Sequence, residues 1–414
     1  MIDAYDVVVA GAGLAGATLA LALARAGLSV ALADPQPFEA QTDPAFDGRA
    51  SAVSFAPFRV WRALGVAERL GPVQPITRIV VTESGPGGSA PRTASPAWIG
   101  FDAAELEGAD AGEPLGWMIE NRAARAALAA AVAEAGVAVL APAAVTGWSP
   151  DSQAASVQLS DGRTLRAALL VAADGRDSPL RRLARIDVNG WAYGQTALVA
   201  TVAHSLPHEG VARQVFLPTG PVALLPLTGD RCSLVWTETP AHAAALAAMP
   251  AEAFASLLAR RVGDALGALS LDGPRWTHPL QLQVAERRTA DRLALLGDAA
   301  CAVHPLAGQG LNLGLKDVAA LAETLADAAR VGEDLGGPGV LARYARRRSF
   351  DAATLAASTD ALTRLYARTG PLTRVVRSAG VALTNGDGRL RRFLAREAGG
   401  SAGAPPRMLR GEPL

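Results

Sequence analysis

The stretch YDVVVAGAGLAGATLALALARAGLSVALAD, residues 5–34, decides the fold. A β-rich run leads into the motif Gly11-Ala-Gly13-Leu-Ala-Gly16, an apolar helix follows, and a second strand ends at Asp34. Glycines at this spacing permit a tight turn and close approach of a pyrophosphate, and the acid is placed to hold a ribose hydroxyl. The stretch therefore predicts dinucleotide binding, without separating FAD from NAD. Asp34 could also be a simple strand-end turn residue.

Two further apolar strands end in an aspartate next to a glycine. LLVAA at 169–173 runs into Asp174-Gly175, and a second apolar run leads into Gly297-Asp298. Open α/β sheets bind their ligands at the carboxyl edge of the strands, so these pairs and the first glycine motif are expected at one site. Asp174 could instead be an ordinary turn residue.

A loop with glycines follows the second of these pairs. Pro305, Gly308 and Gly310 precede a helix whose apolar residues, from Leu311 onward, recur three and four positions apart. A strand, loop and helix in this order aim backbone N–H groups and the positive helix end at one point, which suits an anion or an electron-rich ring. Glycines there would let a planar ligand lie against the backbone. A corner that needs glycine only for its turns explains the same pattern.

Arginines near two predicted helix starts are weaker candidates. Arg49 precedes one helix, and Asn121 with Arg122 opens another, which carries Arg125 on the next turn. Arg49 could contact a flavin or phosphate, or simply be solvated. Arg122 and Arg125 could clamp a diphosphate or only solvate their helix.

Length and composition set limits on the function. A chain of 414 residues can bury the core of one large domain or of two intertwined ones. Lys and Arg (39) balance Asp and Glu (39), so no global charge favours nucleic acid as a partner. The two cysteines form no CxxC pair, which predicts no metal site and a reduced cytoplasmic setting. Neither a signal peptide nor a membrane-spanning segment is expected.

Six stretches, taken with the three glycine motifs, resemble one family over nearly the whole chain. The resemblance is to the FAD-dependent aromatic hydroxylases of the p-hydroxybenzoate hydroxylase fold, and within them to the ubiquinone-biosynthesis hydroxylases of the UbiH/UbiF/UbiI type. The stretches are ASAVSFAPFRVWRALGV (50–66), MIENR (118–122), YGQTALVATVAH (193–204), FLPTGPVALLPL (216–227), HPLAGQGLNLGLKDV (304–318) and YARRRSFDAATLAASTDALTRLY (344–366).

The resemblance implies an α/β fold. A Rossmann-like FAD-binding domain would be interleaved with a substrate-binding β-sheet domain, and helices would follow at the C-terminus. The expected domains are 1–75, 105–185 and 285–340 for FAD, 76–104 and 186–284 for the substrate sheet, 341–400 for a basic helical region and 401–414 for a flexible tail.

The resemblance also implies which residues hold FAD. The diphosphate would lie on the first glycine motif, the adenosine ribose on Asp34 and the ribityl chain on Asp298. Cys301 departs from the family, which often has histidine there. The full set of implied cofactor residues is Gly11, Gly13, Leu14, Ala15, Gly16, Asp34, Arg49, Asn121, Arg122, Asp174, Gly175, Gly297, Asp298, Pro305, Gly308, Gln309, Gly310, Leu311 and Asn312.

The implied activity is hydroxylation of an aromatic ring of a polyprenylated phenol in ubiquinone biosynthesis, through a C4a-hydroperoxyflavin. NADPH or NADH would be the electron donor and dioxygen the co-substrate. No catalytic base is assigned; His304 is a weak candidate, and a structural role suits it better. The alternatives are a hydroxylase of a small soluble aromatic and a non-catalytic, FAD-stabilised scaffold of a quinone-synthesis complex.

The C-terminal region is basic. Residues 341–400 hold 12 arginines and four acids, interleaved with apolar side chains. Such a segment fits docking on an anionic membrane, where a polyprenyl substrate resides. A solvated helical cover and a subunit interface are the alternatives. The expected location is the cytoplasm, with contact to the inner membrane and to a quinone-biosynthesis complex as further hypotheses.

Overall fold

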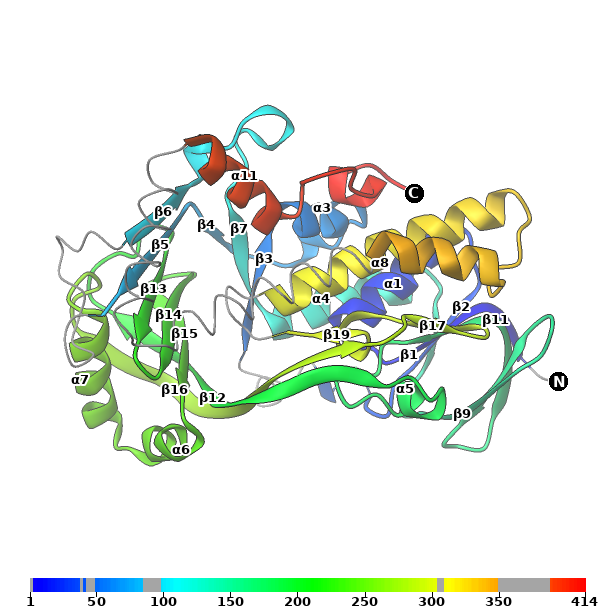
Figure 1. The fold of residues 1–414 in the computed structure, drawn as a ribbon, viewed down its shortest axis with the longest axis horizontal. Coiled ribbons are helices and arrows are strands. Elements are labelled where there is room, and N and C mark those ends of the chain that lie inside the picture. Colours follow the sequence, from blue (N-terminus) through cyan, green and yellow to red (C-terminus); the bar gives the residue numbers. More distant parts are fainter. Residues whose placement is uncertain (1–2, 38–39, 42–48, 85–97, 304–308, 349–387) are drawn as a thin grey trace.

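The computed structural model describes residues 3–37, 40–41, 49–84, 98–303, 309–348 and 388–414. Two large sheets organise the chain (Figure 1). The first has parallel strands in the order β18-β11-β1-β2-β8 at its centre, with β17 at one edge and the β9-β10 hairpin attached to β11. Its strands are β1 (Asp3–Ala10), β2 (Val30–Ala33), β8 (Ala138–Leu140), β9 (Val145–Pro150), β10 (Ala155–Leu159), β11 (Thr164–Ala172), β17 (Thr289–Ala290) and β18 (Leu293–Leu295).

Both faces of the parallel sheet are covered, which explains why its strands are continuous apolar runs rather than alternating ones. On one face lie α1 (Leu14–Arg25), α4 (Asn121–Glu134) and α8 (Gln309–Arg330), which share one apolar cluster with β1. On the other face, α5 (Pro179–Leu183) and the β9-β10 hairpin close a second cluster. The sheet is therefore buried between two layers.

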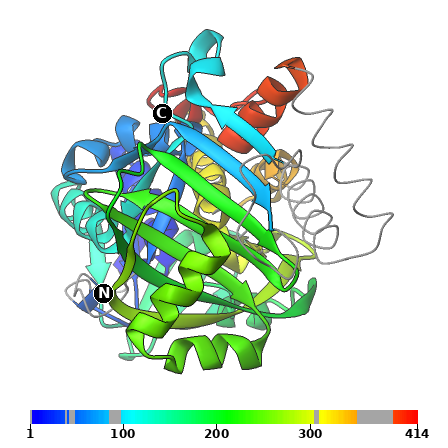
Figure 2. The same ribbon diagram turned by 90° about the vertical axis from the view of Figure 1, so that its left-hand side faces the viewer.

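The second sheet is antiparallel except where β5 pairs with β13, and its order is β19-β16-β12-β15-β14-β13-β5-β6. Helices α6 (Pro240–Ala248) and α7 (Ala251–Val262) lie on one of its faces (Figure 2). The strands are β5 (Arg78–Glu83), β6 (Trp98–Asp102), β12 (Val188–His204), β13 (Val211–Leu217), β14 (Gly220–Leu227), β15 (Arg231–Glu238), β16 (Leu269–Ala285) and β19 (Cys301–Ala302).

Smaller elements join the two large sheets. A third sheet has the order β3-β7-β4. The remaining elements are β3 (Ala50–Ser54), α3 (Phe55–Ala63), η1 (Ala67–Arg69), β4 (Gln74–Ile76), η3 (Ala103–Glu105), η4 (Gly108–Asp110), β7 (Gly116–Glu120), η5 (Gly297–Ala299), a helical stretch at 338–348, α11 (Gly388–Gly399) and η7 (Arg407–Arg410).

The predicted α/β class, with a parallel dinucleotide-binding sheet and a separate β-sheet, is confirmed. Strands from 78–102 and 188–285 share the second sheet, and β19 adds a short edge strand to it. The domain boundaries themselves stay a prediction. Among the described helices, none combines the length and the hydropathy that crossing a bilayer requires.

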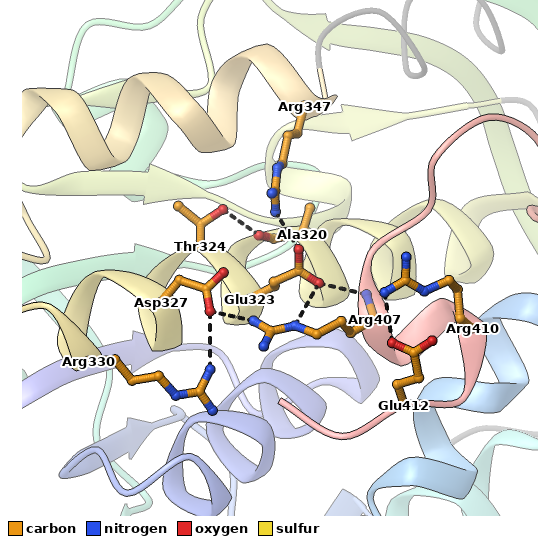
Figure 3. A network of polar contacts seen from close by, with 9 residues as sticks. All are labelled: Ala320, Glu323, Thr324, Asp327, Arg330, Arg347, Arg407, Arg410 and Glu412. Atoms are coloured by element: carbon orange, nitrogen blue, oxygen red, sulfur yellow. Dashed lines mark hydrogen bonds and ion pairs between the residues drawn. The ribbon is translucent and has the colours of Figure 1, made fainter.

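The prediction that 401–414 is a flexible tail is wrong. Met408 and Leu409 are only 1% and 3% exposed, and η7 lies against α3 and α8. The backbone N–H of Arg407 donates to Glu323 Oε2 at 2.6 Å, and its guanidinium contacts Asp327 at 2.5 Å (Figure 3). The glycines and prolines of this segment suggested disorder, but two apolar side chains and an arginine have partners on helices distant in sequence.

In the described parts of 341–400, most arginines have acidic partners elsewhere in the molecule. Six described arginines of this region form ion pairs with acids that lie outside it. The pairs are Arg343–Glu333, Arg347–Glu323, Arg348–Asp317, Arg391–Glu105, Arg392–Glu107 and Arg396–Asp110. For the part of the region that the structure describes, the charge argument for membrane docking is therefore weakened.

Truncating the anchor of the C-terminal segment is expected to destabilise the protein. Met408→Ala removes a buried side chain and should lower the free energy of unfolding by about 2–4 kcal/mol. Glu412→Ala, at an exposed position of the same segment, should change it by less than about 0.5 kcal/mol. Urea unfolding measures both, and equal small effects would mean that the segment does not pack in solution.

Candidate functional site

Four strand ends of the parallel sheet reach the same level. Ala10 at the end of β1 pairs with Ala33 of β2 and Ala172 of β11, and Ala172 pairs with Leu295 of β18. The next residue in each strand continues this alignment, since Gly11 N–H donates to Ala33 O at 2.7 Å. The register therefore brings the predicted glycine motif, Asp34 and both aspartate–glycine pairs to one edge.

The first glycine motif closes tightly against β11. Gly11 has φ +104°, and a Cβ added there would lie 2.3 Å from the carbonyl oxygen of Ala173. A Cβ on Gly16 would lie 2.0 Å from the carbonyl oxygen of Gly11. Side chains at these two positions would force the turn apart.

The start of α1 is open toward one side. Gly13 is the N-cap, has no side chain to cap the helix, and would place a Cβ in space that no atom occupies within 4 Å. The N–H groups of the first turn, from Leu14 and Ala15 onward, have no acceptor within an α-helix. This leaves a cradle of N–H donors at the positive end of the helix, which suits a diphosphate.

Asp34 is fixed beside this cradle. Its Oδ2 accepts from Ala12 N–H at 2.6 Å, and its Oδ1 accepts from Gln36 N–H at 2.8 Å and Gln41 Nε2 at 3.1 Å. A carboxylate can accept about four hydrogen bonds, so room remains for a ribose hydroxyl. Asp34 is thus a positioned acceptor, and the same bonds also close the turn after β2.

Asp174 is a buried carboxyl at the end of β11. Its Oδ2 accepts from Leu180 N–H at 3.1 Å, and its Oδ1 is buried with no hydrogen-bond partner among the described residues. Burial raises the pKa of Asp174, against the opposing effect of the Ser178 hydroxyl. The carboxyl therefore holds the start of α5, while Gly175, at φ +84°, turns the chain beside the glycine motif.

Gly297 and Asp298 form the fourth corner of the site. Gly297 has φ +60°, and its N–H donates to the buried carboxylate of Asp317 on α8 at 3.1 Å. Asp298 has an exposed surface, but the surrounding protein partly shields its carboxyl from water, and this desolvation raises its pKa. The positive charges of Arg176 and Arg49 act in the opposite direction and lower the pKa. Asp298 is thus an accessible carboxyl in a recess with nearby positive charge.

The start of α8 lies against β3. Asn312 is 1% exposed; its Nδ2 donates to Ala52 O and its Oδ1 accepts from Ser54 N–H, both at 2.9 Å. The Asn312 side chain therefore joins the helix to β3, and a ligand would meet the helix backbone there. Gln309, Gly310 and Leu311 form the first turn of α8. His304, Pro305 and Gly308 lie outside the described residues.

Asn121 and Arg122 point in different directions. Asn121 is buried and accepts a 2.7 Å hydrogen bond from Ser51 Oγ of β3. Arg122 pairs with Glu120 at 2.7 Å and lines a cavity of about 510 Å³ between β7, α4 and the β14-β15 turn. Arg125, one turn further along α4, is buried. The two predicted cofactor residues thus do not share one contact surface.

Sequence reasoning missed the ion cluster under the fourth corner. Asp317 contacts Arg288 and Arg348, and all three are buried. The only local signal is the charged pair Lys316-Asp317 within the mostly apolar stretch after Asn312. Its partners come from positions 29 and 31 residues away, which no helical spacing reveals.

Together these features fit FAD. The glycine cradle has the space and the donors for a diphosphate, Asp34 is a positioned acceptor beside it, and Asp298 is an accessible acceptor at another strand end of the same edge. A protein-family model described as an FAD binding domain matches residues 4–359. The chain therefore belongs to this FAD-binding family.

Curated relatives extend the match over almost the whole chain. Ubiquinone hydroxylase UbiL of Rhodospirillum rubrum is 43% identical over 99% of this chain and 93% of its own length. The 3-demethoxyubiquinol 3-hydroxylase of Escherichia coli is 32% identical over 94% of this chain and 96% of its own. The ubiquinone biosynthesis monooxygenase COQ6 of Rattus norvegicus is 32% identical over 92% of this chain and 88% of its own length.

Solved structures agree. PqsL of Pseudomonas aeruginosa, described as an FAD-dependent monooxygenase, has a TM-score of 0.74 at 27% identity and covers 92% of this chain and 99% of its own. The p-nitrophenol 4-monooxygenase PnpA of Pseudomonas putida has a TM-score of 0.80 at 19% identity and covers 98% of this chain and 100% of its own. At this identity it supports the fold alone. The predicted family is confirmed, and with it a flavin-dependent monooxygenase that uses FAD, dioxygen and a reduced nicotinamide nucleotide.

Alanine at two glycines should separate binding from folding. Gly13→Ala places a methyl group in open space at φ −61° and should leave the free energy of unfolding within about 0.5 kcal/mol, while weakening FAD binding about tenfold or more. Gly16→Ala should cost about 1–3 kcal/mol because its methyl meets the Gly11 carbonyl. Urea unfolding of the apoprotein and flavin fluorescence titration measure the two effects. Unchanged FAD affinity in Gly13→Ala would place the diphosphate elsewhere.

Both cysteines should be inert in the folded protein. Cys301 and Cys232 are 2% and 1% exposed, and burial raises the pKa to about 11 for Cys301 and about 12 for Cys232. The thiols are therefore protonated and covered at neutral pH, and neither is a nucleophile. A disulfide reagent such as DTNB at pH 8 should react with neither until denaturant is added, and then with both. Rapid reaction of Cys301 in the native protein would contradict this.

Proposed function

We propose that this protein hydroxylates an aromatic ring of a polyprenylated phenol in ubiquinone biosynthesis. One oxygen atom of O₂ enters the ring, the other leaves as water, and a reduced nicotinamide nucleotide supplies two electrons. The relatives named above support the pathway. The observation that carries the proposal in the structure is the uncharged face of the second sheet.

The second sheet has two unlike faces. The face toward α7 carries large apolar side chains such as Leu198, Leu234 and Trp236, which pack with Phe254 and Leu258. The strand registers place small or uncharged side chains side by side on the opposite face. They are Ala197, Val199, Thr201, Ala212, Gln214, Phe216, Pro221, Ala223, Leu225, Ser233, Val235 and Thr237. These twelve residues form the uncharged centre of the face, and the charged residues Arg231 and Glu83 lie at its ends, where Arg231 pairs with Glu120.

This uncharged face turns toward the flavin-binding half. Ala212 is a member of the apolar cluster that contains residues of α1 and α8, and Leu225 packs against that cluster. Figure 1 shows the same arrangement, with α7 on the outer side of the sheet and α8 on its inner side. A wall of small, uncharged side chains supports a pocket for an apolar, ring-bearing substrate rather than for a charged one.

The residues of this chain then have separate tasks. FAD, when bound, supplies the activation of dioxygen. The start of α1 and Asp34 bind the cofactor's diphosphate and ribose, and Asp298 holds its ribityl chain. The uncharged wall holds the substrate ring near the cofactor and excludes water from it.

The proposal includes work at the cytoplasmic side of the inner membrane, within a quinone-biosynthesis complex. Helix α11 leaves Phe393 57% and Leu394 37% exposed, while Arg391 is held by Glu105 at 2.6 Å. This arrangement supports a contact made by apolar side chains more than by free positive charge.

Quinone lipids from a source strain that lacks this gene test the proposal. Mass spectrometry should detect a prenylated phenol short of one oxygen, and expression of the wild-type chain should remove it. Ala223→Trp, which adds bulk to the uncharged wall, should bind FAD normally and fail to remove the intermediate.

Asp298→Ala tests whether the protein acts as an enzyme or as a non-catalytic scaffold, because only an enzyme needs its FAD to rescue the strain. Asp298→Ala should fold stably and bind FAD too weakly to be loaded at cellular FAD concentrations, although a titration still measures its affinity, and it should not rescue the strain. Equal rescue by this variant would favour the scaffold role. A normal quinone profile in the deletion strain, with no second hydroxylase for the step, would point to a small soluble aromatic substrate instead.

A further inference from the structure

A buried carboxylate holds the turn that presents Asp298. Asp317 is 1% exposed, and its Oδ2 accepts the N–H of Gly297 at 3.1 Å. Arg348 Nε donates to its Oδ1 at 2.6 Å, and Arg288 Nη1 lies 3.1 Å from both oxygens. Both oxygens of this carboxylate thus have hydrogen-bond partners, and the bond to Gly297 N–H orients the backbone beside Asp298.

The two arginines keep Asp317 ionised. Burial alone would raise the pKa of Asp317, but Arg288 and Arg348 outweigh it, so that the pKa lies below its usual range. The surrounding titratable groups Tyr344, Cys301 and Asp298 carry no positive charge. An ionised acceptor makes the stronger hydrogen bond to Gly297 N–H.

Residues 338–348 hold the same turn at two points. Tyr344, fully buried, donates its hydroxyl to Leu295 O at 2.8 Å, on the strand that leads into the turn. Arg348, on the next helical turn, reaches Asp317 beneath Gly297. This stretch therefore contacts both the strand and the support of the turn.

The turn lies next to α1 and α8. A Cβ on Gly297 would lie 3.6 Å from the Cβ of Ala15 on α1, and one on Gly314 of α8 would lie 3.3 Å from the same atom. The turn therefore packs beside α1 and α8, and the hydrogen bond from Gly297 N–H to Asp317 fixes its backbone next to Asp298.

We propose that Asp317 is a positioning residue for FAD and that Arg348 couples the helical stretch 338–348 to the cofactor site. The carboxylate fixes Gly297 and thereby sets the place of Asp298, and Arg348 fixes the carboxylate. The proposal rests on the assignment of Asp298 to FAD and not on the identity of the hydroxylated substrate.

FAD affinity, measured by flavin fluorescence on purified full-length protein, tests the coupling. Arg348→Met should weaken FAD binding about tenfold, which is the loss expected when a charge-assisted hydrogen bond is no longer held in place. Arg348→Lys, which keeps the charge, should recover part of the affinity. Arg347→Met is the matched control: its guanidinium pairs with Glu323, away from the turn, and it should leave FAD affinity within about twofold.

A double variant separates positioning from general destabilisation. In an Asp298→Ala background, Arg348→Met should have little further effect on FAD affinity, because the residue through which it acts is gone. Apoprotein melting temperatures identify variants that fail to fold, and Asp317→Asn then serves as the second probe of the same contact. Equal losses with and without Asp298, or an affinity unchanged in folded Arg348→Met, would overturn the proposal. Neither result would bear on the hydroxylation itself.

Discussion

The close approach of backbones that carry no side chains is the constraint on which the site depends. Gly11 and Gly16 let the first turn of the chain touch β11, and Gly297, at φ +60°, allows the left-handed turn that lies beside α1. Because these segments are nearly in contact, the four strand ends form one continuous edge. This packing brings together segments that lie far apart in the sequence, from Gly11 to Gly314.

The edge combines two kinds of support. Main-chain donors at the start of α1 are fixed by the helix itself and need no other residue. The carboxyls are fixed by hydrogen bonds to neighbours, as Asp34 is by Ala12 and Asp298 is indirectly by Asp317. A cofactor with both phosphate and hydroxyl groups matches this combination. The uncharged wall of the second sheet then adds selectivity for an apolar ring, with few polar side chains of its own.

Much of this edge could be predicted from the sequence, because its signals are local. Two such signals are the spacing of Gly11, Gly13 and Gly16 and the acid at a strand end. Each can be recognised within a few residues of sequence, because it reflects what the local backbone requires. The ion cluster at Asp317 and the anchoring of Met408 could not be predicted, since they depend on partners far along the chain. The hydrogen bonds from the Asn312 side chain to β3 could not be predicted for the same reason, since β3 lies about 260 residues earlier in the chain. The sequence alone likewise suggests that the arginines of the C-terminal region are free charges. Their acidic partners, such as those in Figure 3 and around η4, come from distant parts of the chain.

The order of strands in the parallel sheet also governs when the protein can become active. β1 lies between β2 and β11, and β11 in turn pairs with β18, so neighbours in the sheet come from positions near 10, 170 and 295. During synthesis at the ribosome, β1 waits for β11, which ends at Ala172, and the complete edge waits for β18, which ends at Leu295. Contacts of such long range are slow to form, and in the nascent βαβ unit one edge of β1 has no partner strand in the meantime. FAD that stabilises the finished edge would then act as a late selection step for chains that have folded completely.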